Sequence, residues 1–412
     1  MIKLLHFADA HIDIANHGRH DPQSGLTVRS LDFLKALDTI IDAAIDEHVD
    51  LVLFAGDAYR DRTPVPTFQR EWGKRIQRLS QAEIQTLLLV GNHDLSPAIG
   101  RAHALQEFDT LQVPYVRVLD KPQFLTPQDL QNLPVQMIAI PWVSRSRLMA
   151  ALELTGSQST EVYAEIEARL TVLIHTWLEN ADPDLPIILT AHASVQGAKY
   201  GAERSVMLGN DIVLPGSLVR DARLDYVALG HIHKAQDLNE GARPAVIYPG
   251  SIERVDFGEA QDDKFFVIAE IDEVKRDRPS VNWIKLEGRK FIDCSLQITS
   301  PGDIFRQMVK ALPSQEEFTD AIVRFTLEYP REYDPMIDDA ALRLYMTSAF
   351  EFYFVRRPRL DARIRLPGDE RISSLTPMEL LEKYWDVVNI QRDDLDDLNK
   401  LAQEIISGAG LE

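Results

Sequence analysis

Short hydrophobic runs alternate with longer amphipathic segments through the first two-thirds of the chain. The runs are short, rich in Val, Ile and Leu, and bounded by Gly, Pro, Asp or Asn, which is typical of buried β-strands. Between the first two runs, Leu34, Leu37, Ile41 and Ala44 recur at helical spacing. Continuously apolar strands that alternate with helices predict an α/β domain whose sheets are covered on both faces. The predicted strands are Ile2–Phe7, Leu51–Ala55, Thr86–Val90, Gln136–Ile140, Ile187–Thr190, Tyr226–Leu229, Ala245–Tyr248 and Phe265–Ile271.

The pattern changes after residue 286. Hydrophobic and polar positions now alternate within the strand-like segments, as they do in strands that are exposed on one face. This change predicts a first domain over residues 1–286 and a small α+β domain over residues 287–357. The elements predicted for the small domain are strands at Lys290–Ile298, Ala321–Tyr329 and Phe350–Val355 and a helix at Asp303–Leu312.

The C-terminal part of the chain consists of a basic segment followed by two amphipathic helices. Six arginines lie between residues 356 and 371. Residues 358–375 are interpreted as a linker, and a solvated connector is favoured over a segment that binds DNA. In residues 376–412, Thr376 and Glu379 form a capping box that predicts a helix start. These helices either pack on the protein's own small domain or dock on a partner helix, and the apolar face that follows the linker favours docking.

Composition narrows the class of protein. Of the 412 residues, 45% are hydrophobic and 26% are charged, as in ordinary soluble globular proteins. Cys294 is the only cysteine, which excludes an internal disulfide framework and a cysteine-rich metal site. An acidic residue follows too soon after Met1 for a signal peptide, and no apolar run is long enough to span a membrane. We therefore expect a cytoplasmic protein.

The formal net charge is −20 at pH 7. A free-standing DNA-binding protein usually has a basic excess, because neutralisation of phosphates supplies most of its non-specific affinity. The charge therefore predicts that the protein acts on something small, carries bound cations, or uses the positive surface of a partner.

Five of the predicted strands run into Asp, Asn or His side chains at their carboxyl ends, which is where ligand sites of α/β sheets lie. Oxygen and imidazole donors without a thiolate suit Mn²⁺, Fe²⁺ or Zn²⁺. These donors are too many for one tetrahedral ion, and they suit two metals that share a bridging carboxylate. Asp9 and His11 can bind one ion together, whereas His231 and His233 can point to two different ions. The candidate ligands are Asp9, His11, Asp57, Asn92, His192, His231 and His233.

Five motifs, in chain order, resemble those of the calcineurin-like metallophosphoesterases. They are Asp-x-His, Gly-Asp, Gly-Asn-His-Asp, a lone His and Gly-His-x-His, and they end at His233. Within that superfamily, the segments Tyr226–Lys234 and Tyr248–Glu259 look like the SbcD group, bacterial nucleases of double-strand-break repair that are related to the eukaryotic meiotic-recombination nuclease. The resemblance implies a sandwich of two mixed β-sheets flanked by helices.

The resemblance also implies roles for individual residues. His93 is the histidine that binds no metal and is expected to orient the phosphate, stabilise developing charge or protonate the leaving oxygen. The segment Tyr248–Glu259 is expected to support the site from behind the ligands. One Mn²⁺ would be bound by Asp9, His11, Asp57 and His233, and the other by Asp57, Asn92, His192 and His231, with Mg²⁺ or another divalent ion as the alternative.

The implied activity is that of a Mn²⁺-dependent DNA nuclease in double-strand-break repair, a 3′–5′ exonuclease on duplex ends and an endonuclease on single strands and hairpins. The implied partner is an SbcC-type ABC ATPase with coiled-coil arms, on which residues 376–412 would dock while residues 287–357 help to select DNA ends. The nuclease would form a homodimer within a heterotetramer. ATP would be hydrolysed by the partner, because this chain has no Gly-x-x-x-x-Gly-Lys-Ser/Thr loop.

Two departures from the SbcD pattern stand out. Ile12 and Asp13 follow the first motif where Leu-Gly is common, and Arg60 stands where a His or Asp often supports the catalytic histidine, with Asp61 one position later. The sequence therefore leaves open which residue supports His93, and Arg60 is predicted to contact substrate phosphate instead.

Two alternative functions use the same residues. A phosphoesterase for small phosphodiesters or phosphoproteins shares the metal site, but it needs neither the small domain nor the docking helices. A non-catalytic scaffold on the same fold is marked by lost ligands, and here all seven candidates and His93 are present.

Overall fold

The computed structural model of the protein describes most of the chain, and two compact units are found in it. The first unit comprises residues 1–293 together with the short stretches 315–324 and 348–351, and the second comprises 294–314, 325–347 and 352–412. The described residues are 1–14, 19–95, 101–143, 159–201, 212–359, 376–388 and 392–408.

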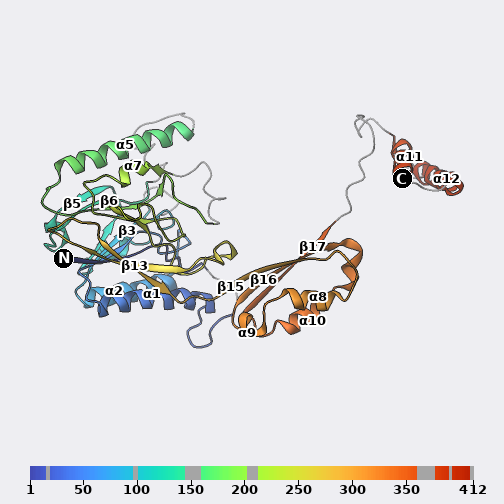
Figure 1. Ribbon diagram of the computed structural model, residues 1–412, viewed down its shortest axis with the longest axis horizontal. Coiled ribbons are helices and arrows are strands. Elements are labelled where there is room, and N and C mark those ends of the chain that lie inside the picture. The colour runs from blue at the N-terminus through green and yellow to red at the C-terminus, as the bar shows by residue number, and fades with distance from the viewer. Residues whose placement is uncertain are drawn as a thin grey trace. The chain divides into compact units, whose positions relative to one another are not determined.

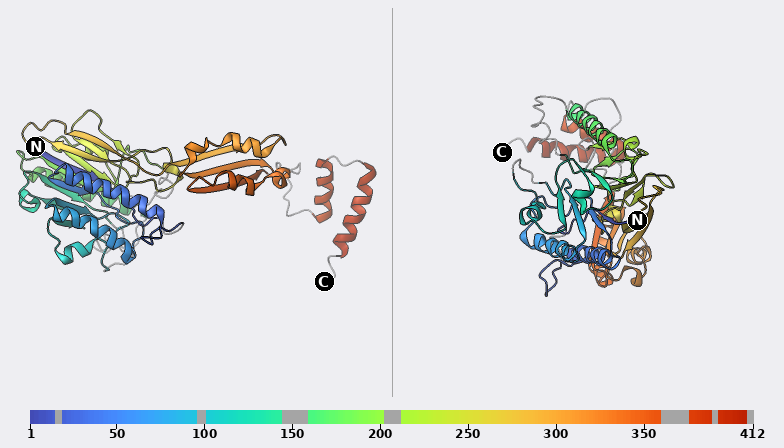
Figure 2. Two further views of the ribbon diagram at one scale, coloured as in Figure 1. Left: turned by 90° about the horizontal axis from the view of Figure 1, so that it is seen from below. Right: turned by 90° about the vertical axis from the view of Figure 1, so that its left-hand side faces the viewer.

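The first unit contains two six-stranded β-sheets (Figures 1 and 2). The first sheet has the order β14-β13-β1-β2-β3-β4, in which β1 to β4 are parallel and β13 and β14 are antiparallel to their neighbours. The antiparallel edge strand β14 is not among the predicted strands. The strands of this sheet are β1 (Ile2–Phe7), β2 (Leu51–Phe54), β3 (Gln85–Leu89), β4 (Val116–Leu119), β13 (Lys264–Ile271) and β14 (Ser280–Leu286).

The second sheet has the order β11-β12-β10-β7-β6-β5. Its four central strands are parallel, and β5 and β11 are antiparallel at the edges. Both sheets are therefore mixed. Its strands are β5 (Gln123–Leu125), β6 (Gln136–Ile140), β7 (Ile187–His192), β10 (Tyr226–Gly230), β11 (Gln236–Asp237) and β12 (Ala245–Tyr248), and a separate parallel pair is formed by β8 (Ser194–Val195) and β9 (Val213–Leu214).

The strands are apolar on both faces because each sheet is covered on one face by the other sheet and on the other face by helices. Leu4 and Leu53 of the first sheet and Ala228 and Ile247 of the second belong to one buried cluster, which joins the sheets. The other face of the first sheet packs on α1 and α2, and that of the second sheet packs on α5 (Figure 1). This confirms the predicted α/β sandwich of two mixed sheets flanked by helices. The helices of this unit are α1 (Val28–Asp46), α2 (Pro66–Gln81), α3 (Gln106–Leu111), α5 (Ser159–Asn180), α7 (Gly216–Val219) and the 3₁₀ turns η1 (Pro127–Leu130) and η2 (Phe257–Glu259).

Three strands in the order β15-β16-β17 form a separate sheet after residue 286. Alternate residues of β16 are buried, as the alternating pattern predicts. Asp303 accepts a hydrogen bond from the backbone N–H of Arg306 and so caps the predicted helix. The elements are β15 (Phe291–Gln297), α8 (Ile304–Ala311), α9 (Gln315–Phe318), β16 (Ile322–Pro330), η3 (Arg331–Met336), α10 (Asp339–Tyr345) and β17 (Glu351–Arg359).

The chain ends in two helices, α11 (Pro377–Val388) and α12 (Arg392–Gly408). Thr376 and Glu379 form the predicted capping box, with the Thr376 backbone N–H donating to the Glu379 carboxylate at 2.7 Å. The predicted linker at 358–375 lies outside the described residues, apart from the last two residues of β17. In the described part of the chain, no helix combines the length and the apolar character that a membrane span requires.

Candidate metal and phosphoester site

The seven candidate ligands converge on one place in the first unit, although they come from five strands of two different sheets. Each of them follows the carboxyl end of β1, β2, β3, β7 or β10 or stands on its last residue. Six are at least nine-tenths buried, and Asn92 is partly buried. A buried cluster of carboxylates and imidazoles demands compensating positive charge, because isolated charges are costly to bury.

Asp9, His11 and His233 form the first group, with ligand atoms that all lie within 4.8 Å of one another. The Nδ1 atom of His11 donates to the carbonyl oxygen of Tyr59 at 3.1 Å, and that of His233 donates to the Glu259 carboxylate at 2.7 Å. The two Nε2 atoms then meet at 3.2 Å. Two imidazole nitrogens at this distance need a proton or a cation between their lone pairs.

The second group is formed around His192. Its Nδ1 atom donates to the carbonyl oxygen of Ala55 at 2.7 Å. Its Nε2 atom lies 3.0 Å from Asn92 Oδ1 and 3.4 Å from Asp57 Oδ2. His231 Nδ1 lies 3.1 Å from the same Asn92 oxygen. The imidazole of His231 therefore lies beside Asn92, whereas that of His233 lies beside His11.

Asp57 connects the two groups. Its Oδ2 atom lies 3.8 Å from His11 Nε2 as well as 3.4 Å from His192 Nε2. Burial alone would raise the pKa of Asp57, but His192 and His93 outweigh burial and hold the pKa well below its usual range. An ionised carboxylate between two groups of donors is the arrangement expected of a bridging ligand.

The neighbouring carboxylates also change the pKa of His192. Burial would lower the pKa of His192, but the charges of Asp57 and Asp9 raise it to about 9. The carboxylates thus draw positive charge to this position. Carboxylate, amide and imidazole donors are suited to divalent metal ions such as Mn²⁺, Fe²⁺ or Zn²⁺, so the residues present fit the ions that the sequence predicts.

The backbone is strained at four of the candidate ligands. Asp9, His11, Asp57 and His231 have φ angles of +50°, +39°, +65° and +95°. Non-glycine residues rarely adopt this region, and such conformations persist at functional sites where the surrounding structure imposes them. The strain is therefore independent support for a functional site at these strand ends.

Glycines make room for the ligands. A Cβ atom on Gly91 would lie 2.1 Å from Asp57 Oδ1, and one on Gly230 would lie 2.1 Å from the carbonyl oxygen of Ala55. Glycines at such positions commonly let the backbone approach a bound group. Here the contacts show that they let the strand ends approach one another, which brings the ligands together.

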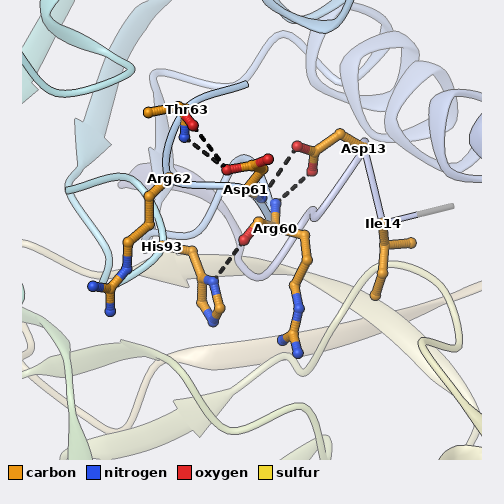
Figure 3. A pocket seen from close by; sticks show the side chains of 7 residues that line it. All are labelled: Asp13, Ile14, Arg60, Asp61, Arg62, Thr63 and His93. Atoms are coloured by element: carbon orange, nitrogen blue, oxygen red, sulfur yellow. Dashed lines mark hydrogen bonds between the residues drawn. The ribbon is translucent and has the colours of Figure 1, made fainter. Parts of the chain in front are cut away.

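His93 lies beside the first group, with its ring centroid 5.2 Å from that of His11. Its Nδ1 atom donates to the carbonyl oxygen of Arg60 at 2.8 Å (Figure 3). Burial lowers the pKa of His93, more than the attraction of Asp57 raises it. The residue that supports His93 is thus Arg60, through its main chain, which is why the missing His or Asp side chain at position 60 leaves no gap.

Asp13, the other departure from the SbcD pattern, holds the loop that carries this carbonyl group. Its two carboxylate oxygens accept hydrogen bonds from the backbone N–H groups of Arg60 and Asp61. A continuous chain of hydrogen bonds therefore runs from Asp13 through Arg60 to His93. We infer that Asp13 is a positioning residue for His93.

Replacement of Asp13 tests this role. In Asp13→Ala we expect kcat for phosphodiester hydrolysis to fall about tenfold, because two backbone donors lose their acceptor and the loop is freed. Asp13→Asn, which keeps one carbonyl oxygen, is expected to restore part of the loss. The pH dependence of kcat should change with Asp13→Ala, whereas Mn²⁺ affinity should not. A loss of Mn²⁺ affinity equal to the loss of kcat would contradict the assignment.

Asp94 fixes the two strand ends that carry Asp57 and Asn92. Its carboxylate accepts hydrogen bonds of 2.9 Å from the backbone N–H groups of Asp57, Ala58 and Gly91. Burial and the neighbouring Asp57 raise the pKa of Asp94 to about 7. In the sequence, Asp94 stands out only as the end of a motif. Its role in the structure is to hold one ligand strand against the other.

The support predicted for Tyr248–Glu259 is provided largely by Glu259. One carboxylate oxygen accepts from His233 Nδ1, and the other accepts from Lys264 Nζ at 2.6 Å and from Ser251 Oγ at 3.2 Å. Burial would raise the pKa of Glu259, but the hydrogen bond from His233 and the charge of Lys264 hold it well below its usual range. A carboxylate behind a ligand histidine fixes the ring and its tautomer.

Glu259→Gln is therefore expected to weaken Mn²⁺ binding about 10- to 100-fold, as the loss of a partner behind a ligand commonly does. Glu253→Gln is the matched control, because Glu253 is an equally buried glutamate of the same segment whose carboxylate accepts from the backbone N–H groups of Arg254 and Arg289. Isothermal titration of both variants with Mn²⁺ measures the difference. Equal affinities would show that Glu259 does not act through His233.

Trp142 is a further residue of the site that was not among the predicted ones. Its ring packs against His231 with centroids 5.0 Å apart and against His192 at 6.2 Å. Its backbone N–H donates to the carbonyl oxygen of Val90 at 2.9 Å, next to the end of β3. The only signal in the sequence is the position of Trp142 shortly after the predicted strand Gln136–Ile140.

Fold and site together define a phosphoesterase. The chain matches the family model of the calcineurin-like phosphoesterases over residues 2–235, and it belongs to that family. This places the protein among the hydrolases that cleave phosphoesters.

The chain is also similar in sequence to curated proteins. The chain is 25% identical over 273 residues to the uncharacterized metallophosphoesterase YhaO of Bacillus subtilis, a match that covers 65% of this chain and 57% of YhaO. It is 26% identical over 272 residues to the SbcD subunit of the nuclease SbcCD of Escherichia coli, covering 64% of each chain. The match thus spans less than two-thirds of the length of these relatives.

Among solved structures, a dimetal phosphatase from Danio rerio aligns with 68% of this chain and 98% of its own, with a TM-score of 0.37 and 11% identity.

Proposed function

We propose that this protein is a metal-dependent nuclease that hydrolyses DNA phosphodiesters at strand ends, in the 3′–5′ direction on duplexes, and within single strands and hairpins. The observation that carries the proposal is the pair of donor groups that Asp9 and Asp57 join, with His93 beside them. The likeness to the SbcD subunit of the nuclease SbcCD supports DNA as the substrate and double-strand-break repair as the setting.

In this proposal the seven candidate ligands would hold two Mn²⁺ ions, in the division that the resemblance to the SbcD group implies. Divalent cations, when bound, polarise the phosphoryl group and lower the pKa of water. Asp57, Asp9 and the histidines position the ions, while Glu259 and Asp94 fix the ligands. His93, with its Nδ1 proton held by Arg60, is oriented to present its other nitrogen to the phosphate or the leaving oxygen.

The partner we propose is an SbcC-type ATPase with coiled-coil arms, on which residues 376–412 dock, within a heterotetramer that contains two copies of this chain. Tyr384, Leu401 and Ile405 expose between 40% and 63% of their surface on α11 and α12, which suits docking on another helix. Residues 287–357 would act as a domain that caps DNA ends. The partner would also add basic surface to this acidic chain, whose net charge is −20.

A nuclease assay on a blunt duplex labelled at its 3′ or 5′ end tests the activity. It is run with Mn²⁺, Mg²⁺ or EDTA, beside bis(p-nitrophenyl) phosphate as a small ester and with the coiled-coil ATPase and ATP added in a second series. Stepwise shortening of the DNA with Mn²⁺ supports the proposal, and the label shows the direction. Hydrolysis of the small ester with the DNA left intact in both series would refute it and would favour small phosphodiesters or phosphoproteins as substrates.

A further inference from the structure

A pocket of about 570 Å³ lies directly beside His93. Its wall is formed mainly by the loop after β2, whose residues 60–63 are all exposed. Figure 3 shows the His93 ring between the side chains of Arg60 and Arg62, with both guanidinium groups and the ring pointing the same way. Two positive side chains therefore flank the residue that we place next to the scissile phosphate.

The two acidic side chains that line the pocket, Asp13 and Asp61, form hydrogen bonds within the protein. The Asp13 carboxylate accepts from two backbone N–H groups, and Asp61 Oδ1 accepts from the backbone N–H and the hydroxyl group of Thr63. Over the residues that the structure describes, neither Arg60 nor Arg62 forms an ion pair.

Many other arginines of this acidic protein are paired with carboxylates. Arg75, for example, contacts Asp38 and Glu71, and Arg289 contacts Asp32. The charge of Arg60 and Arg62 is not taken up by such a pair, so it is available to an anionic ligand.

Arg60 is also joined directly to the site. Its carbonyl oxygen accepts a hydrogen bond from His93 Nδ1 at 2.8 Å. The Arg60 side chain therefore starts next to the residue that we place beside the scissile phosphate.

We propose that Arg60 and Arg62 bind the phosphates of a nucleic-acid strand on either side of the scissile phosphate, and that they thereby select a phosphodiester chain over an isolated phosphoester. The guanidinium group suits this task because its planar fork binds phosphate oxygens in pairs. A small ester has one phosphate, which occupies the metal site and leaves both arginines without a ligand. This inference deepens the proposed function and rests on it for the identity of the chain as DNA.

The test compares a short single-stranded oligonucleotide with bis(p-nitrophenyl) phosphate in Arg60→Gln, Arg62→Gln and the double variant of the full-length protein with Mn²⁺. Arg169→Gln is the control, because Arg169 is exposed on α5 and pairs with Glu165 of the same helix. The oligonucleotide is measured both as a substrate and as a competitive inhibitor of ester hydrolysis, and inorganic phosphate is measured as a second inhibitor.

We expect kcat/KM for the oligonucleotide to fall about tenfold in each single variant, which corresponds to one hydrogen bond to a charged group. The inhibition constant of the oligonucleotide should rise by a similar factor, and the slope of log affinity against log salt concentration should fall by about 0.7 per arginine. Loss on the small ester should be several-fold smaller, and the inhibition constant of inorganic phosphate should stay within about twofold. The control should match the wild type throughout.

Equal losses on the oligonucleotide and the ester would overturn the inference, because the arginines would then act on the scissile phosphate alone. An unchanged inhibition constant for the oligonucleotide in the double variant would overturn it as well. The inhibition arm does not need DNA cleavage. If the wild type hydrolyses the ester but not DNA, the proposed nuclease fails, while weaker inhibition by the oligonucleotide in the variants still supports the two arginines as its binding site.

Discussion

Asp57→Ala is expected to lower phosphodiester hydrolysis by about a thousandfold or more, because it removes a carboxylate that lies between His11 and His192, at 3.8 and 3.4 Å from their Nε2 atoms. Its Oδ1 atom also accepts from the backbone N–H of His93 at 2.8 Å, so the same change loosens the residue beside the candidate metal site. Steady-state kinetics with Mn²⁺ measure the loss, and isothermal titration should show that fewer Mn²⁺ ions bind.

The control for this variant is Asp109→Ala, which removes an exposed carboxylate of α3. Circular dichroism should give the same secondary structure for both variants, since Asp57 lies at a strand end and not within the sheet. Mn²⁺-dependent hydrolysis that survives in a folded Asp57→Ala protein would remove the basis for the whole metal site.

His93→Ala is expected to lower kcat about 10²- to 10⁴-fold, which is the usual contribution of a group that transfers or orients a proton in the transition state. Unlike Asp57→Ala, it should leave Mn²⁺ binding intact, since the Nδ1 atom of His93 is committed to the Arg60 carbonyl oxygen and the ring lies beside the donor groups. A loss of kcat without a loss of Mn²⁺ binding would therefore distinguish His93 from Asp57.

His175→Ala provides the comparison, because His175 is a partly buried histidine of α5 that interacts with Arg223. It should retain wild-type kinetics. If His93→Ala lost Mn²⁺ binding in proportion to kcat, His93 would have to be counted as a ligand, and the division of the donors between two ions would need revision.

Hydrophobic patterning predicted most of the fold of the first unit, because strands covered on both faces are continuously apolar. The runs Ile2–Phe7, Gln136–Ile140 and Ala245–Tyr248 coincide with β1, β6 and β12. The strand β14 was missed because its residues alternate between exposed and partly buried positions, so it lacks the apolar run that marks the others. The order of strands within each sheet is set by long-range pairing and cannot be read from local pattern.

The candidate ligands could be named from the sequence because metal chemistry needs side chains of a few types, and these stand where predicted strands end. The residues that position them were harder to find. The support of His93 is a carbonyl oxygen, and every residue has one, so no residue type marks it. Asp13, Asp94 and Glu259 act through contacts with distant backbone and ring atoms, and their acidic side chains look no different in the sequence from those at the surface.

The left-handed backbone at Asp9, His11, Asp57 and His231 has a consequence for laboratory evolution. Each such conformation costs on the order of 1–3 kcal/mol, and glycine adopts it without steric penalty. A library screened only for survival at high temperature would therefore tend to enrich glycine at these positions. The selected proteins would be more stable but would have lost the side chains that are proposed to bind metal. Selection of a heat-resistant form of this enzyme has to impose turnover and temperature in the same round.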